Sequence, residues 1–469
     1  MRKGFLFDLN KCVGCQACVV ACQIENHGVS SEPWREIDTY NSFQHPALPM
    51  FHFSLACNHC QDPLCLVHCP ARAYKKDAVH QTVDYEEDHC IGCRYCTWAC
   101  PYDAPKFILA KEVVEKCTLC KERILDGRKP NCANLCPTGA LDFGDIDEEG
   151  VADLPGFIDK GIRPGIKIIP LRKNRHSHPN IPSLSLQQTE LFASLENVGK
   201  QKVTLKEEWS LVLFTLLVAL LFGLVASALV RPIAVDPFVF VAVGIAGMML
   251  SAIHLGKKLR AWRAILNVRS SWLSREIVGY SSFLLFSSLS MSFFPTEAMV
   301  IVSALLGLVT LICIDMVYAV TEKRPMPGLS SASVMLTGLL FFSVMSEIHW
   351  MFIIVLAWKF ALYSMDLFRS RSRGYLRVVL STTRIVVGFV LPLLLGAAQG
   401  VSMVAGIFIL AAEIINRVEF YLDLEIITPR KQIEKELLKT LDWQSHSIGK
   451  GRLTDYRGHD KRAQAEIGS

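Results

Sequence analysis

The pattern of apolar and polar positions divides this chain into two halves. Residues 1–208 are polar and rich in cysteine and proline, whereas Leu, Val, Ile, Phe, Ala and Ser dominate residues 209–422. A helix that crosses a membrane needs about 20 mostly apolar residues. The second half contains eight such runs, which predict an all-α polytopic membrane domain of about eight transmembrane helices. The runs are 209–230, 238–256, 276–294, 298–320, 330–347, 349–368, 376–398 and 401–422.

The charges between these runs suggest which membrane face the N-terminal half occupies. An even number of spans returns the chain to its starting side, so the N-terminal half shares a face with every second loop. The loop before the third run holds six cations and no acid: Lys257, Lys258, Arg260, Arg263, Arg269 and Arg275. The positive-inside rule then predicts a multi-pass protein of the cell (inner) membrane with a cytoplasmic N-terminal half. The alternative is that these cations dock on an acidic surface of that half.

Sixteen of the 17 cysteines lie in four groups between Cys12 and Cys136. The first and third groups have the spacing C-x2-C-x2-C-x3-C of bacterial ferredoxins, which hold [4Fe–4S] clusters. The other two keep the opening pair and the closing step, with a longer insertion before the third cysteine. We therefore expect an α+β ferredoxin-like domain over 1–145, built as two paired bacterial-ferredoxin modules with four [4Fe–4S] clusters.

In the ferredoxin pattern three thiolates of a group hold one cluster and the fourth ligates the neighbouring cluster. The two adjacent central groups should exchange their fourth cysteines, and so should the two outer groups. Four ligand sets follow. Set A is Cys12, Cys15, Cys18 and Cys136; set B is Cys57, Cys60, Cys65 and Cys100; set C is Cys90, Cys93, Cys96 and Cys69; set D is Cys117, Cys120, Cys132 and Cys22.

Other uses of cysteine fit this chain poorly. Structural zinc takes four thiolates from two C-x2-C pairs, which differs from a triplet with a displaced fourth cysteine. Disulfides mark small secreted domains, and the N-terminus has neither a signal-peptide core nor a twin-arginine pair. The net charge of +5 is small for 469 residues and gives no reason to expect nucleic acid as a partner.

Ionisable residues inside the apolar runs are candidates for function, because burying them in a membrane is costly. His254 ends the second run and Glu276 opens the third, both on the side of the cysteine domain, where a histidine and a carboxylate could take protons from a quinol. The alternative is that they only cap helices. Arg384, Glu413 and Arg417 form either a structural ion pair or part of a quinone or proton path. A b-type haem is not expected, since only His349 could pair with His254.

Several stretches carry a family resemblance. CVGCQACVVAC, CNHCQDPLCLVHCP, CIGCRYCTWACPYDAPKF and KCTLCKERILDGRKPNCANLCPTGALDFG resemble the four-cluster electron-transfer subunit of dimethyl sulfoxide reductase and related molybdopterin oxidoreductases. EEWSLVLFT and HLGKKLRAWRAILNVRSSWLSREIVG are similar to the membrane-anchor subunit of the same enzymes. These subunits are usually separate chains, whereas here they are fused. The join is expected as an extended linker over 146–208, and the charged tail 423–469 is expected to begin with a short amphipathic helix.

The resemblance implies an electron-transfer and membrane-anchor subunit that is not catalytic at the terminal substrate. In the anchor family a histidine and a glutamate at His254 and Glu276 serve quinol oxidation. Electrons from menaquinol in the membrane's quinone pool would reach a separate molybdopterin-containing catalytic subunit during anaerobic respiration. Better-known relatives place the cluster domain outside, against the charge-based expectation. Two alternatives stay open. Electrons could flow in the opposite direction, from a dehydrogenase to quinone, or the chain could be a membrane redox sensor.

Overall fold

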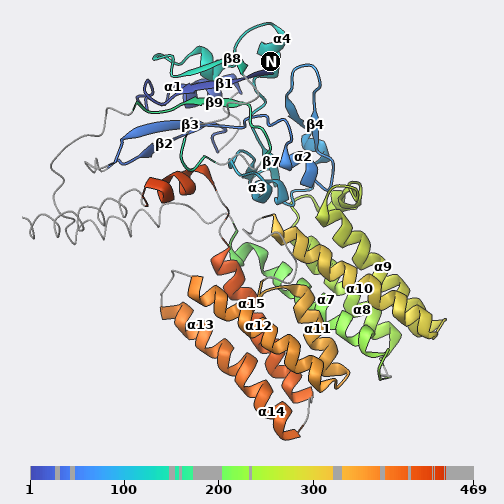
Figure 1. The fold of residues 1–469 in the computed structure, drawn as a ribbon. Coiled ribbons are helices and arrows are strands. Elements are labelled where there is room, and N and C mark those ends of the chain that lie inside the picture. The colour runs from blue at the N-terminus through green and yellow to red at the C-terminus, as the bar shows by residue number, and fades with distance from the viewer. Residues whose placement is uncertain are drawn as a thin grey trace, which may run out of the picture.

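The computed structural model describes most of both halves of the chain. The described residues are 2–26, 32–42, 48–146, 154–157, 161–172, 203–231, 235–320, 330–369, 375–399, 403–424, 426, 428–437 and 439. A domain of short strands and helical turns lies at one end of a bundle of long helices (Figure 1). The two parts correspond to the polar and apolar halves of the sequence.

The N-terminal domain is built from short elements joined by loops. In chain order they are β1 (Arg2–Asp8), α1 (Ala17–Glu25), β2 (Glu36–Tyr40), β3 (Phe51–Leu55), α2 (Leu64–His68), β4 (Tyr74–Lys76), β5 (Val83–Tyr85), η1 (Glu87–His89), α3 (Tyr95–Ala99), β6 (Lys106–Ile108), β7 (Val113–Glu115), α4 (Lys121–Leu125), α5 (Asn131–Asn134), β8 (Leu141–Ile146) and β9 (Ile166–Ile169). Each helix α2 to α5 has only four or five residues. The small α+β domain predicted from the cysteine pattern is therefore present.

The largest sheet holds the first strand of the chain between two later ones, in the order β8-β1-β9. Alternate residues of β1 point inward, and Phe5 and Phe7 are each 1% exposed. Phe5 lies opposite Phe143 of β8, and their ring centroids are 5.6 Å apart. This apolar face anchors the N-terminus to the end of the last cysteine group.

Strand β9 corrects the predicted linker. Residues 146–208 were expected to be extended, but Ile166–Ile169 pairs in parallel with β1, and Ile166 and Ile168 are buried in the domain core. Phe157 stacks on Tyr102 at 5.2 Å. The ferredoxin-like domain therefore includes residues well beyond 146, and the prediction of a linker is wrong for these residues. Residues 173–202 of the predicted linker lie outside the described residues.

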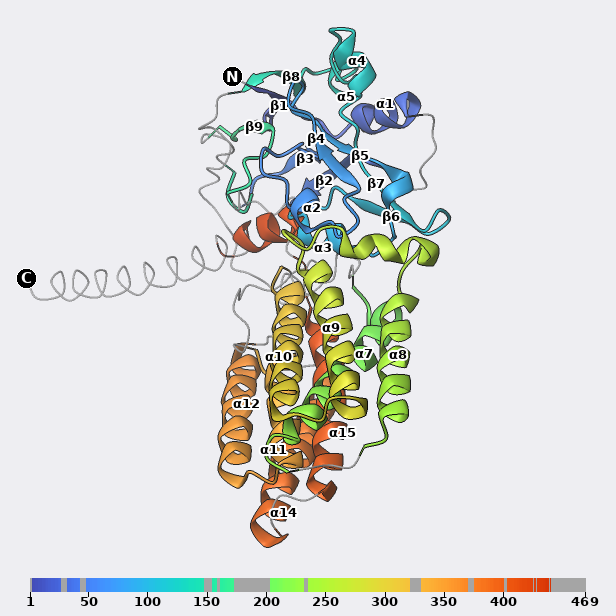
Figure 2. The same ribbon diagram turned by 90° about the vertical axis from the view of Figure 1, so that its right-hand side faces the viewer.

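The described residues of the C-terminal half form helices joined by turns and short loops. Its elements are α7 (Leu205–Ser227), α8 (Pro237–Ile253), η3 (Lys258–Ile265), α9 (Trp272–Ser292), α10 (Glu297–Ala319), α11 (Val334–Met345), α12 (His349–Arg369), α13 (Tyr375–Ile385), the π-helical turn η4 (Val386–Val390), α14 (Leu391–Gln399) and α15 (Met403–Asp423). Each of the eight predicted runs overlaps one helix or one continuous helical rod. Figure 2 shows these rods standing side by side below the N-terminal domain.

Fewer than eight of these rods have the length and composition of a membrane span. Within the described residues four qualify: Leu205–Ser227, Glu297–Ala319, His349–Phe368 and Tyr375–Gly396. A fifth is added if α8 and η3, which are bent by 106° to each other, count as one span. Helix α11 has only 12 residues. The chain is thus a multi-pass membrane protein, and eight spans are not confirmed.

Helix boundaries in this half follow local sequence signals. Asp236 caps α8, its carboxylate accepting hydrogen bonds from the backbone N–H groups of Phe238 and Val239 at 2.8 and 3.2 Å. Pro237 occupies the first helical position, where the lack of an N–H has no cost. Pro392 follows the π-helical turn and cannot donate to the preceding turn, which accounts for the irregular hydrogen bonding between α13 and α14.

The loop between α8 and α9 holds the N-terminal domain against the bundle. Lys257 Nζ lies 3.8 Å from the Glu112 carboxylate, and Arg260 lies 3.4 Å from Asp88 and donates to the backbone oxygen of Glu87 at 3.0 Å. These cations therefore contact acidic groups of the cysteine domain, as the alternative interpretation of the loop predicted. For these two of the six loop cations, docking on the cysteine domain accounts for the charge without reference to membrane sidedness.

The C-terminal tail returns to the N-terminal domain after the last helix. Residues 429–437 are helical. Ile433 is 1% exposed in the core that contains Phe5 and Phe53. Arg430 forms an ion pair with Asp38 of β2 at 3.2 Å. This contact packs the helical segment that follows the last long helix against the N-terminal domain (Figure 1).

Candidate functional site

The two outer cysteine groups come together as predicted sets A and D. Burial raises the pKa of the Cys12 thiol, and so do the neighbouring thiolates of Cys18, Cys136 and Cys15, which complete set A. In set D, burial and then the thiolates of Cys132 and Cys120 raise the pKa of Cys22 to about 12. The last cysteine of each outer group thus lies beside thiols of the other group, as an exchange of fourth ligands would require.

The two central groups form sets B and C. All four thiols of set B line one cavity, together with Asn58, Pro63, Tyr102, Lys116 and several apolar side chains. In set C, burial and then the thiolates of Cys93, Cys90 and Cys69 raise the pKa of Cys96 well above its ordinary value. A cavity bounded by four thiols suits a [4Fe–4S] cluster, whose irons are held by four cysteines.

Backbone N–H groups point at several of these sulfurs. Cys69, Cys90, Cys117 and Cys136 each accept a hydrogen bond from a backbone amide at 3.3–3.4 Å. Such bonds are one of the means by which proteins set cluster potentials. Among the described residues no three His, Cys, Asp or Glu side chains converge as ligands of a single metal ion would. Ligands of a [4Fe–4S] cluster need not converge on one point, because each thiolate binds a different iron.

The four sets follow one another from the top of the domain to the helix bundle. Burial and the thiolates of Cys22, Cys57, Cys132 and Cys120 raise the pKa of Cys117, which places set D beside set B. Tyr74 stands between sets B and C, since burial and the thiolates of Cys96 and Cys65 raise its pKa. In Figure 2 helices α1, α4 and α5, which belong to sets A and D, lie far from the bundle, whereas α3 of set C lies next to it. Sets A and D therefore lie at the end of the domain away from the bundle, set D adjoins set B, and set C lies next to the membrane helices.

Set C is joined to the predicted quinol segment by backbone contacts. Lys257 donates from its backbone N–H to the carbonyl of Ile91 at 3.0 Å, and Gly256 donates to Gly92 at 3.4 Å. Gly92 adopts a left-handed backbone, and an added Cβ would lie 2.8 Å from the backbone of Gly256. An added Cβ on Gly256 would collide with the backbone of Glu112, so both glycines are required where the loop meets the cysteine domain. Leu255, next to His254, packs on the core that contains Cys90 and Cys96.

Glu276 lies in the first turns of α9 and is 5% exposed. No hydrogen bond or ion pair joins it to His254 within the described part of the chain, so the structure brings both to the same junction without pairing them. Tyr95 of α3 links this junction to set C, because burial and then the charges of Glu276 and Cys93 raise its pKa. Its hydroxyl donates to the carbonyl of Val317 at 3.1 Å. Sequence reasoning missed Tyr95, although it lies inside the third cysteine motif.

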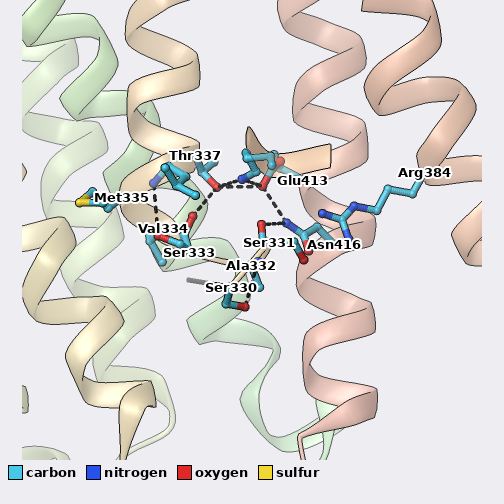
Figure 3. Close-up of polar contacts among 12 residues, drawn as sticks. Ser330, Ser331, Ala332, Ser333, Val334, Met335, Thr337, Arg384, Glu413 and Asn416 are labelled. Atoms are coloured by element: carbon cyan, nitrogen blue, oxygen red, sulfur yellow. Dashed lines mark hydrogen bonds and ion pairs between the residues drawn. The ribbon is translucent and has the colours of Figure 1, made fainter. Parts of the chain in front are cut away.

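The remaining predicted residues belong to a second, fully buried polar cluster among α11, α12, α13 and α15. Glu413 accepts hydrogen bonds from Thr337 at 2.8 Å, Asn416 at 3.1 Å and Lys359 at 2.9 Å. Figure 3 shows Thr337, Glu413 and Asn416 turned toward one another between the helices. Thr337 also accepts from Lys359 at 2.8 Å.

The partners in this cluster differ from those expected. Arg384 pairs with Glu419 at 3.3 Å, and its guanidinium lies 3.7 Å from the ring centroid of Tyr363. Arg417 lies over the rings of Tyr318 and Phe420. Sequence reasoning missed Lys359 and Glu419. A lone lysine in the middle of a predicted span was the available signal, since such a residue needs a buried anion.

Comparison with known proteins bears on both halves. A family described as "4Fe-4S dicluster domain" matches residues 48–146, which span the last three cysteine groups. A family described as "DMSO reductase anchor subunit (DmsC)" matches residues 204–348, from α7 to the end of α11. The fold and these matches define an iron–sulfur electron-transfer protein fused to a membrane anchor.

Individual relatives match the iron–sulfur half. One chain of the anaerobic dimethyl sulfoxide reductase of Escherichia coli K12 is 40% identical over 154 residues, which are 31% of this chain and 74% of the relative. One subunit of the sulfite dehydrogenase of Allochromatium vinosum is 34% identical over 202 residues, or 37% of this chain and 84% of the relative. The formate dehydrogenase-O iron-sulfur subunit of E. coli is 35% identical over 155 residues, or 30% of this chain and 52% of the relative. The chain belongs to the iron–sulfur subunit family of dimethyl sulfoxide reductase, here carrying its own membrane anchor.

Proposed function

We propose that this chain passes electrons from menaquinol in the membrane to a separate molybdopterin-containing catalytic subunit, with four [4Fe–4S] clusters held by sets A, D, B and C as the carriers. A bound cluster of this kind accepts and releases single electrons. The order of the four sets supports a continuous route from the membrane helices to the far end of the domain.

The observation that carries this proposal is the pair of backbone hydrogen bonds between the segment that follows His254 and the ligand loop of set C. The position of Tyr95 supports it. Its ring lies within electrostatic reach of both Glu276 and the set C ligand Cys93. The carbonyls of Ile91 and Gly92, in the same ligand loop, accept hydrogen bonds from the segment that follows His254. A quinol bound at His254 and Glu276 would therefore lie against the loop that holds set C.

His254 and Glu276 would take the two protons that leave a quinol on oxidation. Glu276 is buried, and Nδ1 of His254 is buried as well. Water is thus kept from both groups until substrate brings its own hydroxyls. A buried base of this kind contributes through its position, because proton transfer needs a hydrogen bond to the reacting hydroxyl.

The opposite end of the route is open to a partner. Cys15 of set A is exposed, and the adjoining Val13 and Val20 are 62% and 50% exposed. Apolar side chains around an exposed cluster ligand suit a protein surface that covers them, and we propose that the catalytic subunit docks there. Quinone and lipid are the other partners.

The reverse direction is the second candidate. Relatives of this chain include subunits of a sulfite dehydrogenase and a formate dehydrogenase. The same ligand sets in a dehydrogenase would carry electrons toward quinone. We propose a position in the cell membrane with eight helices crossing it. For the cluster domain, the family resemblance favours the outer face, and docking accounts for two of the six loop cations, Lys257 and Arg260.

The test is cluster reduction by a menaquinol analogue in the complex purified from its native membrane. Glu276→Gln and His254→Ala should each slow reduction by about 100-fold or more, as loss of a general base does. Glu297→Gln is the matched control, since Glu297 is exposed in the first turn of the adjacent α10. Unchanged rates in both site variants would refute the quinol assignment, and fewer than four clusters by iron analysis would refute the four-carrier route.

A further inference from the structure

A buried arginine lies where sets A and D meet. Arg35 immediately precedes β2 and is 1% exposed. Its guanidinium lies 4.6 Å from the ring centroid of Phe5, and one terminal nitrogen donates to Ser54 Oγ at 3.0 Å. Burying a cation among such neighbours is unfavourable unless a negative group compensates it.

No carboxylate compensates Arg35 within the described part of the chain. Its Nε is buried and has no hydrogen-bond partner among those residues. An unsatisfied buried donor of this kind requires an explanation, and an ion or group that binds there is one. A cluster held by the neighbouring thiolates would supply both the negative charge and the sulfur acceptors.

The nearby thiolates belong to two of the predicted sets. Burial lowers the pKa of Arg35, but the thiolates of Cys132, Cys18, Cys117 and Cys22 outweigh this effect and raise it above its ordinary value. Three of the four belong to set D and one to set A. Ser54 adds a direct link to set A, since its Oγ lies 3.3 Å from Cys18 Sγ.

We propose that Arg35 is a positioning residue that raises the reduction potential of the cluster in set D and, to a smaller extent, of the cluster in set A. This inference rests on the proposed function, because it needs separate clusters in both sets. Each added electron makes a cluster more negative. A fixed cation nearby stabilises the reduced form more than the oxidised form, and the effect is large where the dielectric constant is low.

The test is a redox titration followed by electron paramagnetic resonance, on the full chain in its native complex. Cys→Ser variants, one in each set, assign the four signals. Arg35→Met removes the charge, and Arg35→Gln removes it but keeps N–H donors for Ser54. Both should lower the midpoint potential of set D most and that of set A less, with sets B and C unmoved. Arg35→Lys keeps a positive charge and should stay near the wild type.

The matched control is Lys129→Met. Lys129 is half-exposed and paired with Asp142 at 2.6 Å, so its loss removes one cation from the same domain without moving any cluster potential. The inference is overturned if the set A and D potentials stay unchanged in both neutral variants, or if Arg35→Lys shifts them as far as Arg35→Met does. It is also overturned if both neutral variants lose iron, since Arg35 would then serve assembly. Fewer than four signals in the wild type would instead refute the proposed function.

Discussion

The cluster domain and the membrane anchor both bury cations, but they compensate them differently. In the anchor Lys359 and Arg384 each pair with a buried carboxylate, Glu413 or Glu419. In the cluster domain Arg35 and Lys116 are buried, and the described residues offer neither of them a carboxylate. Buried charges are tolerated only when they are paired. The difference therefore indicates that Lys359 and Arg384 of the anchor are compensated within the chain, whereas Arg35 and Lys116 of the cluster domain depend on what the cysteines bind.

Lys116 illustrates the dependence. Its ammonium donates to the backbone carbonyls of Val83 and Cys117. These carbonyls accept its hydrogen bonds, but they carry no net negative charge to compensate the ammonium. It also lines the cavity bounded by set B. A cluster in that cavity would carry the missing negative charge, just as one in set D would for Arg35.

Removal of the clusters should change the stability of the cluster domain relative to the anchor more than any other change proposed below. Oxidation in the presence of a chelator would remove the irons that the sixteen thiols are proposed to hold. Arg35 and Lys116 would then lose the negative charge that compensates them. The domain should then lose its entire stability, which is about 5–15 kcal/mol for a domain of ordinary size. Limited proteolysis should cut residues 2–146 rapidly while α7 to α15 stay protected. A cluster-free domain that resists protease as well as the loaded one would contradict this view.

Breaking one ion pair of the anchor should have the next largest effect. Lys359→Leu leaves Glu413 buried without its cation, and loss of one partner of a buried pair typically costs about 3–5 kcal/mol. The midpoint of chemical unfolding in detergent should fall accordingly, with the cluster signals unchanged until unfolding begins.

The double variant Lys359→Leu with Glu413→Leu is the control for that prediction. Replacement of both partners by apolar residues is often neutral or stabilising. We therefore expect it to recover most of the lost stability. A single variant as stable as the wild type would show that Glu413 is compensated by Arg384 or another neighbour, and the pair would not be the self-sufficient unit that the comparison assumes.

The sequence predicted those features of the molecule that depend on spacing along the chain, namely the cysteine loops and the positions of the long helices. The C-x2-C steps and the closing C-x3-C step keep thiols close in sequence, so the motif predicts which thiols of a group lie together, while the exchange of fourth cysteines between groups stays a prediction. The apolar runs likewise predicted where the helices lie. Glu276 is a candidate because a carboxylate that opens an apolar run is rare, and its role in quinol oxidation stays a prediction.

The parts that sequence could not predict depend on packing between distant segments. Glu413 was expected beside Arg384, but the bundle places Lys359 of α12 against it, and helical periodicity does not say which helices are neighbours. Strand β9 was missed because the alternation in IKII spans only four residues between proline-containing loops. Arg35 carries no local signal at all, since its neighbours come from both ends of the cysteine domain.

The junction of the two halves should show the smallest of these effects, because neutral side chains make its hydrogen bonds to the segment that ends at Cys69. Asn267, 8% exposed in the loop before α9, donates from its side-chain amide to the carbonyls of Val67 at 3.2 Å and Cys69 at 2.9 Å. Asn267→Ala leaves two buried carbonyls unsatisfied, which costs about 1–3 kcal/mol. Amide hydrogen exchange in 64–73 should become faster, and cluster reduction by quinol should slow because Cys69 belongs to set C.

Ser281→Ala separates this junction effect from a general weakening of α9. Ser281 is exposed and donates only within its own helix, to the carbonyl of Ile277 at 2.8 Å. Its loss should leave both hydrogen exchange in 64–73 and quinol-driven reduction unchanged. If Asn267→Ala behaves like Ser281→Ala, the docking of the two halves does not depend on hydrogen bonds to the set C loop. The backbone contacts of Gly256 and Lys257 would then be sufficient to hold the cluster domain on its anchor.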